Sequence, residues 1–391
     1  MPDRIYLDWN ATAPLRPEAR AAMTAALDCV GNPSSVHGEG RAARHIVEEA
    51  REKVAALLGA EPKLVTFTSG GTEANMLALS PAIETADHKA PCDRLLLSAI
   101  EHVSVRAGGR FPAAAVEEVG VTVHGQIDLT ALGKRLATLT ADGQRAMVSV
   151  MSANNETGVV QPISEVAAIA HQAGGILHVD AVQTAGRIPC DINKTGADLL
   201  TVSAHKFGGP KGAGALVRRS EAVHLVPLVK GGGQERGLRA GTENVAAIAG
   251  FGAAAQAASR GLEGDRIRMA ALRERLEARL TAATPQAIIF GAGAERLPNT
   301  TLFAVPGVRA ETAVIALDLE GVAVSSGAAC SSGKVQPSHV LAAMGVSPEL
   351  GRGGLRISLG WSTAESDVDR FIDAWIKVAR ALLKETRGMA A

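Results

Sequence analysis

Hydrophobic and polar positions follow two different patterns along the chain. Between about residues 17 and 260, stretches with apolar side chains at helical spacing alternate with short apolar runs. At 42–58, for example, Ile46, Ala50 and Val54 share one helical face, and Gly59 follows. We predict strands at 64–67, 95–97, 146–151, 176–179 and 198–202, and a helix at 163–172. Strands that alternate with helices predict a mostly parallel sheet with ligands at the carboxyl ends of its strands.

From about residue 263 the pattern becomes that of a smaller α+β domain. We predict helices at 265–280, at 311–319 and after Thr363, and strands at 287–290, 300–305, 322–325 and 355–359. The strand pattern at the N-terminus is expected to join this part. The sequence therefore predicts an α/β protein with a large domain at 15–262 and a small domain formed by 1–14 and 263–391.

Composition narrows the function classes. The chain has 391 residues, enough for two domains with ample cores, and its 47% apolar residues include only 3% aromatics. Lys+Arg and Asp+Glu balance at 40 each, which gives no electrostatic argument for nucleic acid or an anionic membrane. The longest apolar stretch, 245–255, is well under the ~20 residues of a membrane span.

The cysteines and the N-terminus indicate a compartment. Cys29, Cys92, Cys190 and Cys330 lie far apart without CxxC spacing, which argues against a zinc site or a disulfide framework. Cys29 and Cys190 have apolar neighbours and are expected to be buried. No basic segment followed by an apolar one opens the chain, so no secretory signal is visible. We expect a cytoplasmic protein without a metal site.

Lys206 and Asp180 are the most informative pair of residues. Lys206 follows the predicted strand at 198–202, with small residues before it and two glycines soon after it. Asp180 ends the strand before it. A lysine can carry an aldehyde as a Schiff base, and an acid can keep a pyridine nitrogen protonated. Each residue alone is as readily a solvated lysine or a turn-capping aspartate, but together they predict pyridoxal 5'-phosphate.

The segment 68–75 is a candidate phosphate site because it joins a predicted strand to a predicted helix. Its two glycines, Gly70 and Gly71, let the backbone approach a phosphate, the helix start offers free N–H groups, and Thr72 adds a hydroxyl. An ordinary capped helix start explains the segment equally well.

Four further polar residues follow predicted strands or begin one. His102 could stack on a cofactor ring and move protons, although a single histidine is more often structural. Asn155 and Gln183 offer neutral amides for a ring hydroxyl or a carboxylate. Arg356 could clamp a carboxylate, but taken alone it is typical of a surface arginine on an edge strand.

Cys330 lies in a loop of small polar residues, 325–334. Buried structural cysteines usually sit among large apolar neighbours, so this setting favours a reactive thiol. Its thiolate is the reactive form, and a cationic neighbour is expected to lower the pKa of this thiol.

These motifs together resemble those of cysteine desulfurases of the NifS/IscS type, which are fold-type I pyridoxal-phosphate enzymes. The resemblance runs nearly end to end and rests on the segments 6–12, 31–37, 68–75, 101–102, 154–158, 179–183, 203–212, 239–244 and the Cys330 loop. It implies a large domain with a mostly parallel sheet of the seven-stranded type and a smaller α+β domain that carries Cys330.

The resemblance also implies residue roles. Lys206 would carry the cofactor and act as base and acid, Asp180 would pair with the pyridinium, and His102 would stack on the ring. The remaining cofactor contacts would come from Gln183, Thr72, Gly71, Ser203, His205, Asn155 and Thr242. Thr242 would reach the neighbouring subunit, so a homodimer is expected. Asn155, Arg356 and Asn32 would bind L-cysteine, and Cys330 would take its sulfur, leaving alanine and a persulfide.

Other functions remain open at this point. A selenocysteine lyase or another β-eliminating enzyme could work without the loop thiol, so Cys330 favours desulfuration. An inactive scaffold for iron–sulfur assembly has no physical need to keep Lys206, Asp180, His102 and Cys330. A P-loop is excluded because the Gly-Lys-Ser/Thr end is missing. The sulfur acceptor, whether an iron–sulfur scaffold protein, a nitrogenase-related partner or a tRNA thiolation protein, is left undetermined by the sequence.

Overall fold

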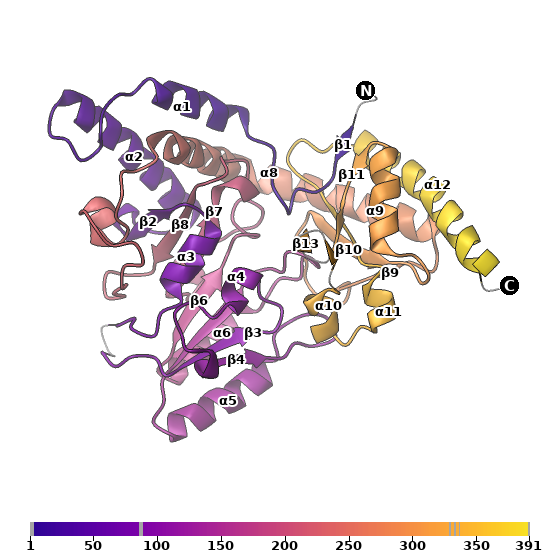
Figure 1. The fold of residues 1–391 in the computed structure, drawn as a ribbon, viewed down its shortest axis with the longest axis horizontal. Coiled ribbons are helices and arrows are strands. Elements are labelled where there is room, and N and C mark those ends of the chain that lie inside the picture. Colours follow the sequence, from indigo (N-terminus) through magenta and orange to yellow (C-terminus); the bar gives the residue numbers. More distant parts are fainter. Residues whose placement is uncertain (1–3, 86–88, 328–329, 332–333, 336, 390–391) are drawn as a thin grey trace.

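The computed structural model describes residues 4–85, 89–327, 330–331, 334–335 and 337–389. The chain folds around two groups of strands (Figure 1). The larger sheet has seven strands, in the spatial order β2 (Val65–Thr68), β8 (Gly214–Arg218), β7 (Leu199–Ser203), β6 (Ile176–Asp180), β5 (Ala146–Met151), β3 (Arg94–Ser98) and β4 (Val116–Val119). Only β8 runs against its neighbours, so the predicted mostly parallel sheet is confirmed.

Helices cover both faces of this sheet, which explains why its central strands are continuous apolar runs. Leu96 packs in one cluster with Leu136 and Val166, whereas its neighbours Leu95 and Leu97 pack with Leu77 on the opposite face. The helices of this part are α1 (Pro17–Leu27), α2 (Gly38–Leu57), α3 (Gly71–Ala78), α4 (Val103–Arg106), α5 (Leu129–Ala141), α6 (Ile163–Gln172), α7 (Ile192–Thr195) and the first half of α8 (Val245–Ala283).

The smaller part has a four-stranded antiparallel sheet with the spatial order β12 (Ser325–Ser326), β15 (Leu355–Ser358), β10 (Thr300–Ala304) and β9 (Ile288–Ile289). Its other elements are α9 (Ala310–Leu319), α10 (His339–Ala343), α11 (Pro348–Gly351), α12 (Glu365–Met389) and the paired strands β13 (Cys330–Ser331) and β14 (Lys334–Val335). Phe303 and Trp375 meet edge to face in its core, with ring centroids 5.1 Å apart.

The N-terminal strand crosses to the smaller part. There β1 (Ile5–Tyr6) pairs in parallel with β11 (Val322–Ala323). Figure 1 shows this indigo strand among the orange elements, far from α1 and α2. The segment that follows β1 therefore passes between the two parts of the molecule. None of the described helices combines the length and the apolar character that crossing a bilayer requires.

Three sequence predictions need correction. The helix predicted at 265–280 is the second half of α8, which already begins at Val245. Its first half was missed because consecutive residues from Ala247 to Gly252 are all buried, which erases the one-sided pattern. The strand predicted at 322–325 is split between β11 and β12, which belong to different sheets.

Cys29 is partly exposed after α1, so its predicted burial is wrong, whereas Cys190 is buried. Because α8 runs through 262/263, the domain boundary there stays a prediction.

Candidate active site

A cavity of about 440 Å³ lies at the carboxyl ends of β3, β5, β6 and β7, where they face β12 and β15. Parallel strands bring the residues that follow them to one edge of a sheet, and here those residues line one space. Ten of the predicted site residues contribute to its lining, namely Gly71, Thr72, His102, Asn155, Asp180, Gln183, Ser203, His205, Lys206 and Arg356.

Lys206 ends a 3-10 turn (Ala204–Lys206) that directly follows β7. Its Nζ donates to the carbonyl oxygen of Asn10 at 2.6 Å and to that of Ala11 at 3.0 Å. Burial, reinforced by the positive charges of Arg356 and Arg187, lowers the pKa of Lys206 to about 7. The amine is therefore partly neutral near neutral pH, which is the form that attacks an aldehyde.

Asp180, the last residue of β6, is held by two donors. The backbone N–H of Val182 donates to Oδ1 at 3.0 Å, and Nδ2 of Asn75 donates to Oδ2 at 2.9 Å. Asn75 lies on α3 and is almost completely buried, and its Oδ1 has no hydrogen-bond partner among the described groups. The carboxylate of Asp180 is thus fixed in a set orientation at the cavity wall.

His102 precedes α4 and accepts a hydrogen bond at Nδ1 from the backbone N–H of Ser104, at 3.2 Å. The hydroxyl of Ser104 lies 2.8 Å from the same nitrogen, and it accepts a hydrogen bond from Nδ2 of Asn75 at 2.9 Å. Burial lowers the pKa of His102, while Asp180 opposes the shift and Lys206 adds to it. His102 is therefore a neutral imidazole whose proton is on Nε2, and it is linked through Ser104 and Asn75 to Asp180.

The amino-terminal end of α3 and the end of β7 form a cradle suited to an anion. A side chain at Gly71 would bring its Cβ within 3.1 Å of Val182, so glycine keeps this wall open. Thr72 and Ser203 offer hydroxyls, and the free N–H groups of a helix start favour a phosphate. Burial, with a contribution from Lys206, lowers the pKa of His205 to about 4, so its imidazole is neutral.

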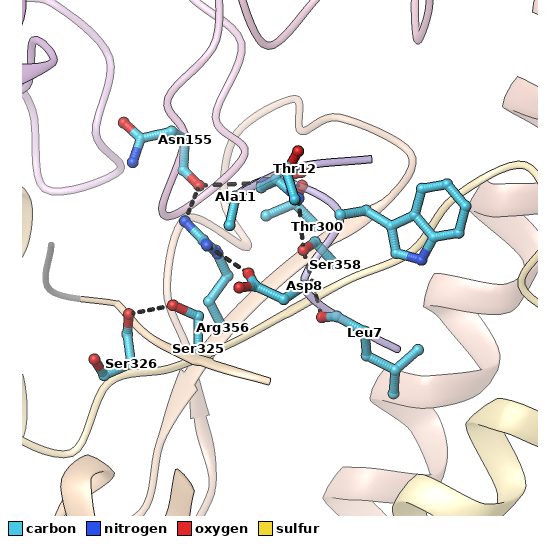
Figure 2. A network of polar contacts seen from close by, with 12 residues as sticks. Leu7, Asp8, Ala11, Thr12, Asn155, Thr300, Ser325, Ser326, Arg356 and Ser358 are labelled. Carbon is cyan, nitrogen blue, oxygen red and sulfur yellow. Dashed lines mark hydrogen bonds and ion pairs between the residues drawn. The ribbon is translucent and has the colours of Figure 1, made fainter. Parts of the chain in front are cut away.

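Arg356 is buried on an interior strand, which corrects its interpretation as a surface arginine on an edge strand. It is 6% exposed on β15, which lies between β12 and β10. One guanidinium nitrogen donates to the carboxylate of Asp8 at 2.7 Å and another to the carbonyl oxygen of Asn155 at 3.0 Å. Its Nε has no partner among the described groups. Figure 2 shows the side-chain amide of Asn155 directed away from this guanidinium.

Among the predicted residues whose side chains are described, Asn32 and Thr242 do not line this cavity in the single chain. Asn32 is exposed between α1 and α2, where its side chain accepts from the N–H of Ser34 at 2.9 Å. Thr242 is exposed shortly before α8. Cys330 begins β13, three residues after Gly327, which lines the cavity; the side chain of Cys330 lies outside the described part of the chain.

Several residues of the site were missed in the sequence. They are Asp8, Asn10, Ala11, Asn75, Ser104 and Arg187, which hold the predicted residues in place. Asp8 offered a signal, because it is an acid shortly after a predicted strand, as Asp180 is. The carbonyl oxygens of Asn10 and Ala11 offered none, since a backbone acceptor has no mark in a sequence.

The sequence matches the family described as Aminotransferase class-V over residues 5–371. A cysteine desulfurase of Cereibacter sphaeroides is 43% identical over 381 residues, which cover 95% of this chain and 94% of that protein. An IscS-like cysteine desulfurase of Mycobacterium tuberculosis is 40% identical over 374 residues, 94% of each chain. The X-ray structure of a NifS-like protein from Rickettsia africae superposes with a TM-score of 0.85 at 35% identity and covers 96% of this chain and 99% of its own. The likeness extends over almost the whole of each chain.

Proposed function

The chain belongs to the aminotransferase class-V family. We propose that this enzyme removes the sulfur atom from L-cysteine, releases L-alanine and keeps the sulfur on Cys330. Its full-length relatives are cysteine desulfurases, and the chain is an enzyme of that kind. The observation that carries the proposal is that ten predicted residues from separate segments line one cavity, with Lys206, Asp180 and Arg356 among them.

The family depends on pyridoxal 5'-phosphate, and the residues present fit that group. A partly neutral amine, a fixed carboxylate and the open cradle at Gly71 match an aldehyde, a pyridinium and a phosphate, respectively. Lys206 would hold the cofactor covalently and Asp180 would pair with its ring nitrogen. Thr72, Ser203 and His205 would bind its phosphate.

Two side chains would contact the ring itself. His102, a neutral flat imidazole at the cavity wall, would stack on it. Gln183 donates through Nε2 to the carbonyl oxygen of Asn10 at 3.2 Å and has a second N–H for an oxygen on the ring. The chemistry supplied by the cofactor, when bound, is an electron sink for bonds broken at the α-carbon of an amino acid.

Substrate would be held by its carboxylate. The guanidinium of Arg356 and the amide of Asn155, two residues that line the cavity, carry donors that suit this group. Lys206, as a neutral amine, would take the proton from the α-carbon and return one to the carbon that loses sulfur.

Cys330 would be the group that receives the sulfur. Its thiolate attacks the sulfur of the bound cysteine, an S–S bond forms and the C–S bond breaks. Cysteine and the enzyme thiol thus become alanine and an enzyme persulfide, with no external oxidant or reductant. Gly327 lines the cavity three residues before Cys330, which supports access of this segment to the substrate.

We further propose a homodimer that passes its sulfur to an acceptor protein such as an iron–sulfur scaffold. Thr242 and Asn32 are exposed and away from the cavity of their own chain, which is compatible with a role at the site of a neighbouring subunit. A cytoplasmic location remains our expectation from the sequence.

Mass spectrometry after turnover tests this function. The protein is incubated with L-cysteine, blocked with an alkylating agent and digested. We expect one added sulfur atom on the peptide that contains Cys330, and alanine in the supernatant. Alanine without added sulfur on any peptide would replace the proposal with a simple lyase.

A further inference from the structure

Arg187 is a buried cation behind the cavity. The residue is 5% exposed, and none of the described carboxylates lies within ion-pair distance of its guanidinium. Burial, with the positive charge of Arg356, lowers the pKa of Arg187 to about 9. A buried charge that no opposite charge compensates lowers the stability of the fold, so a role for Arg187 is expected to lie in the groups that its hydrogen bonds hold.

The guanidinium of Arg187 donates to three loops of the active site. One nitrogen donates to the backbone oxygen of Gln183 at 2.8 Å and also to the side-chain oxygen of Gln183. The other nitrogen donates to the carbonyl oxygen of Lys206 at 3.1 Å and to that of Trp9 at 3.2 Å. Arg187 therefore connects the turn after β6, the turn after β7 and the segment after β1.

These contacts decide which end of the Gln183 amide faces the cavity. Because Oε1 accepts from Arg187, the amide nitrogen must point the other way, where it donates to Asn10 at 3.2 Å. An amide turned by half a rotation would set its NH₂ group against one N–H of Arg187, and that N–H would lose the acceptor that Oε1 provides. A guanidinium at this position thus excludes the alternative orientation.

We propose that Arg187 is a positioning residue of this site, which holds Gln183 as a hydrogen-bond donor toward an oxygen anion on the cofactor ring. The inference rests on the proposed function, since that oxygen belongs to pyridoxal 5'-phosphate. The bond from Arg187 to the carbonyl oxygen of Lys206 braces the lysine that would carry the same cofactor. Its positive charge also favours an anion at this place.

A double-mutant cycle tests this inference on the holoenzyme. Wild type, Arg187→Met, Gln183→Leu and the double variant are titrated while the visible absorption of the bound cofactor is recorded. The other charged or titratable groups that face the cofactor site, Asp8, Asp180, His102, His205, Lys206 and Arg356, are the same in all four proteins.

We expect Arg187→Met to raise the titration midpoint by about one pH unit, because a donor and a positive charge that favour the anion are lost. In the Gln183→Leu background the same change should shift the midpoint by less than half as much, since only the charge effect remains. Arg187→Lys, which keeps the charge and one donor group, should restore most of the wild-type midpoint.

Equal shifts in the two backgrounds, or no shift in either, would overturn the inference, because a merely structural arginine acts independently of Gln183. If Arg187→Met does not fold, Arg187→Gln takes its place in the cycle with the same expected inequality. A wild-type protein that carries no bound chromophore would contradict the proposed function instead, so the two failures are distinguishable.

Discussion

Arg356 donates to the carboxylate of Asp8 across 2.7 Å, an ion pair between residues that are 348 positions apart in the sequence (Figure 2). Both side chains belong to the smaller part of the molecule, yet they face Asn155 of the larger part, whose carbonyl oxygen Arg356 also binds. With two of its nitrogens held, the guanidinium has one orientation. Arg356 also lines the cavity, so this orientation sets how the guanidinium faces a ligand there.

Replacing Arg356 is expected to weaken substrate binding more than cofactor binding. We predict that Arg356→Ala raises KM for L-cysteine by roughly 10- to 100-fold, because a charge-assisted hydrogen bond to the carboxylate is lost. Retention of the cofactor on dialysis should change little. Arg352→Ala, at an exposed arginine of the same region, is the matched control and should keep the wild-type KM. An unchanged KM in Arg356→Ala would show that the carboxylate binds elsewhere.

The lowered pKa of Lys206 predicts a pH dependence of cofactor uptake by the cofactor-free protein. Its pKa of about 7 means that the neutral amine fraction falls about tenfold for each pH unit below that value and levels off above it. The rate of uptake, measured by stopped-flow absorption with pyridoxal 5'-phosphate, should follow the neutral fraction as the pH changes. Lys194→Ala, at an exposed lysine, should leave this pH dependence unchanged. An uptake rate that is constant across neutral pH would contradict the assigned state of Lys206.

The same shift has a consequence for stability. Between about pH 7 and its ordinary value of 10.5, Lys206 is protonated in the unfolded chain but not in the folded one. The folded protein therefore binds fewer protons, and the contribution of this group to the free energy of unfolding rises with pH across that window. The free energy of unfolding, measured with urea for the cofactor-free wild type and for Lys206→Met, should therefore depend on pH with different slopes in this window. Parallel pH profiles would argue against the shift.

We predict that a second chain completes the active site, because the segment 239–244 resembles the motif of the family and Thr242 does not line the cavity of its own chain. Thr242→Ala should weaken cofactor retention by about tenfold or more while the protein stays folded and dimeric, because one hydrogen bond to a charged phosphate is lost. Equilibrium dialysis and sedimentation check the two parts of this prediction. Thr281→Ala, on an exposed part of α8, serves as the control. A fully active monomer would rule out sharing of the site.

The elements that the sequence predicts well are those whose pattern is local. The strand β5 and the helix α6 begin and end where the apolar runs predict, and Lys206 and Asp180 could be paired because consecutive parallel strands end at the same edge. The first half of α8 could not be recognised, since it is buried on all sides and has no polar face.

The parts of the site that the sequence could not give depend on distant segments. Arg356 looks like a surface residue until β12 and β10 enclose its strand and Asp8 supplies its partner. Arg187 acts through carbonyl and amide oxygens of three loops, and its own neighbours in the sequence do not mark it. Such residues are found only when the fold has brought their acceptors together.

The change Cys330→Ser tests the central claim most directly, by measuring persulfide on the enzyme and sulfide release from L-cysteine. We predict that this variant still binds pyridoxal 5'-phosphate and L-cysteine, carries no persulfide and releases almost no sulfide. Cys29→Ser, at a partly exposed thiol, should behave as wild type. Cys92→Ser and Cys190→Ser should at most lose stability, on the order of 1–3 kcal/mol, because both residues are buried. Wild-type sulfide release by Cys330→Ser would contradict transfer of sulfur to Cys330.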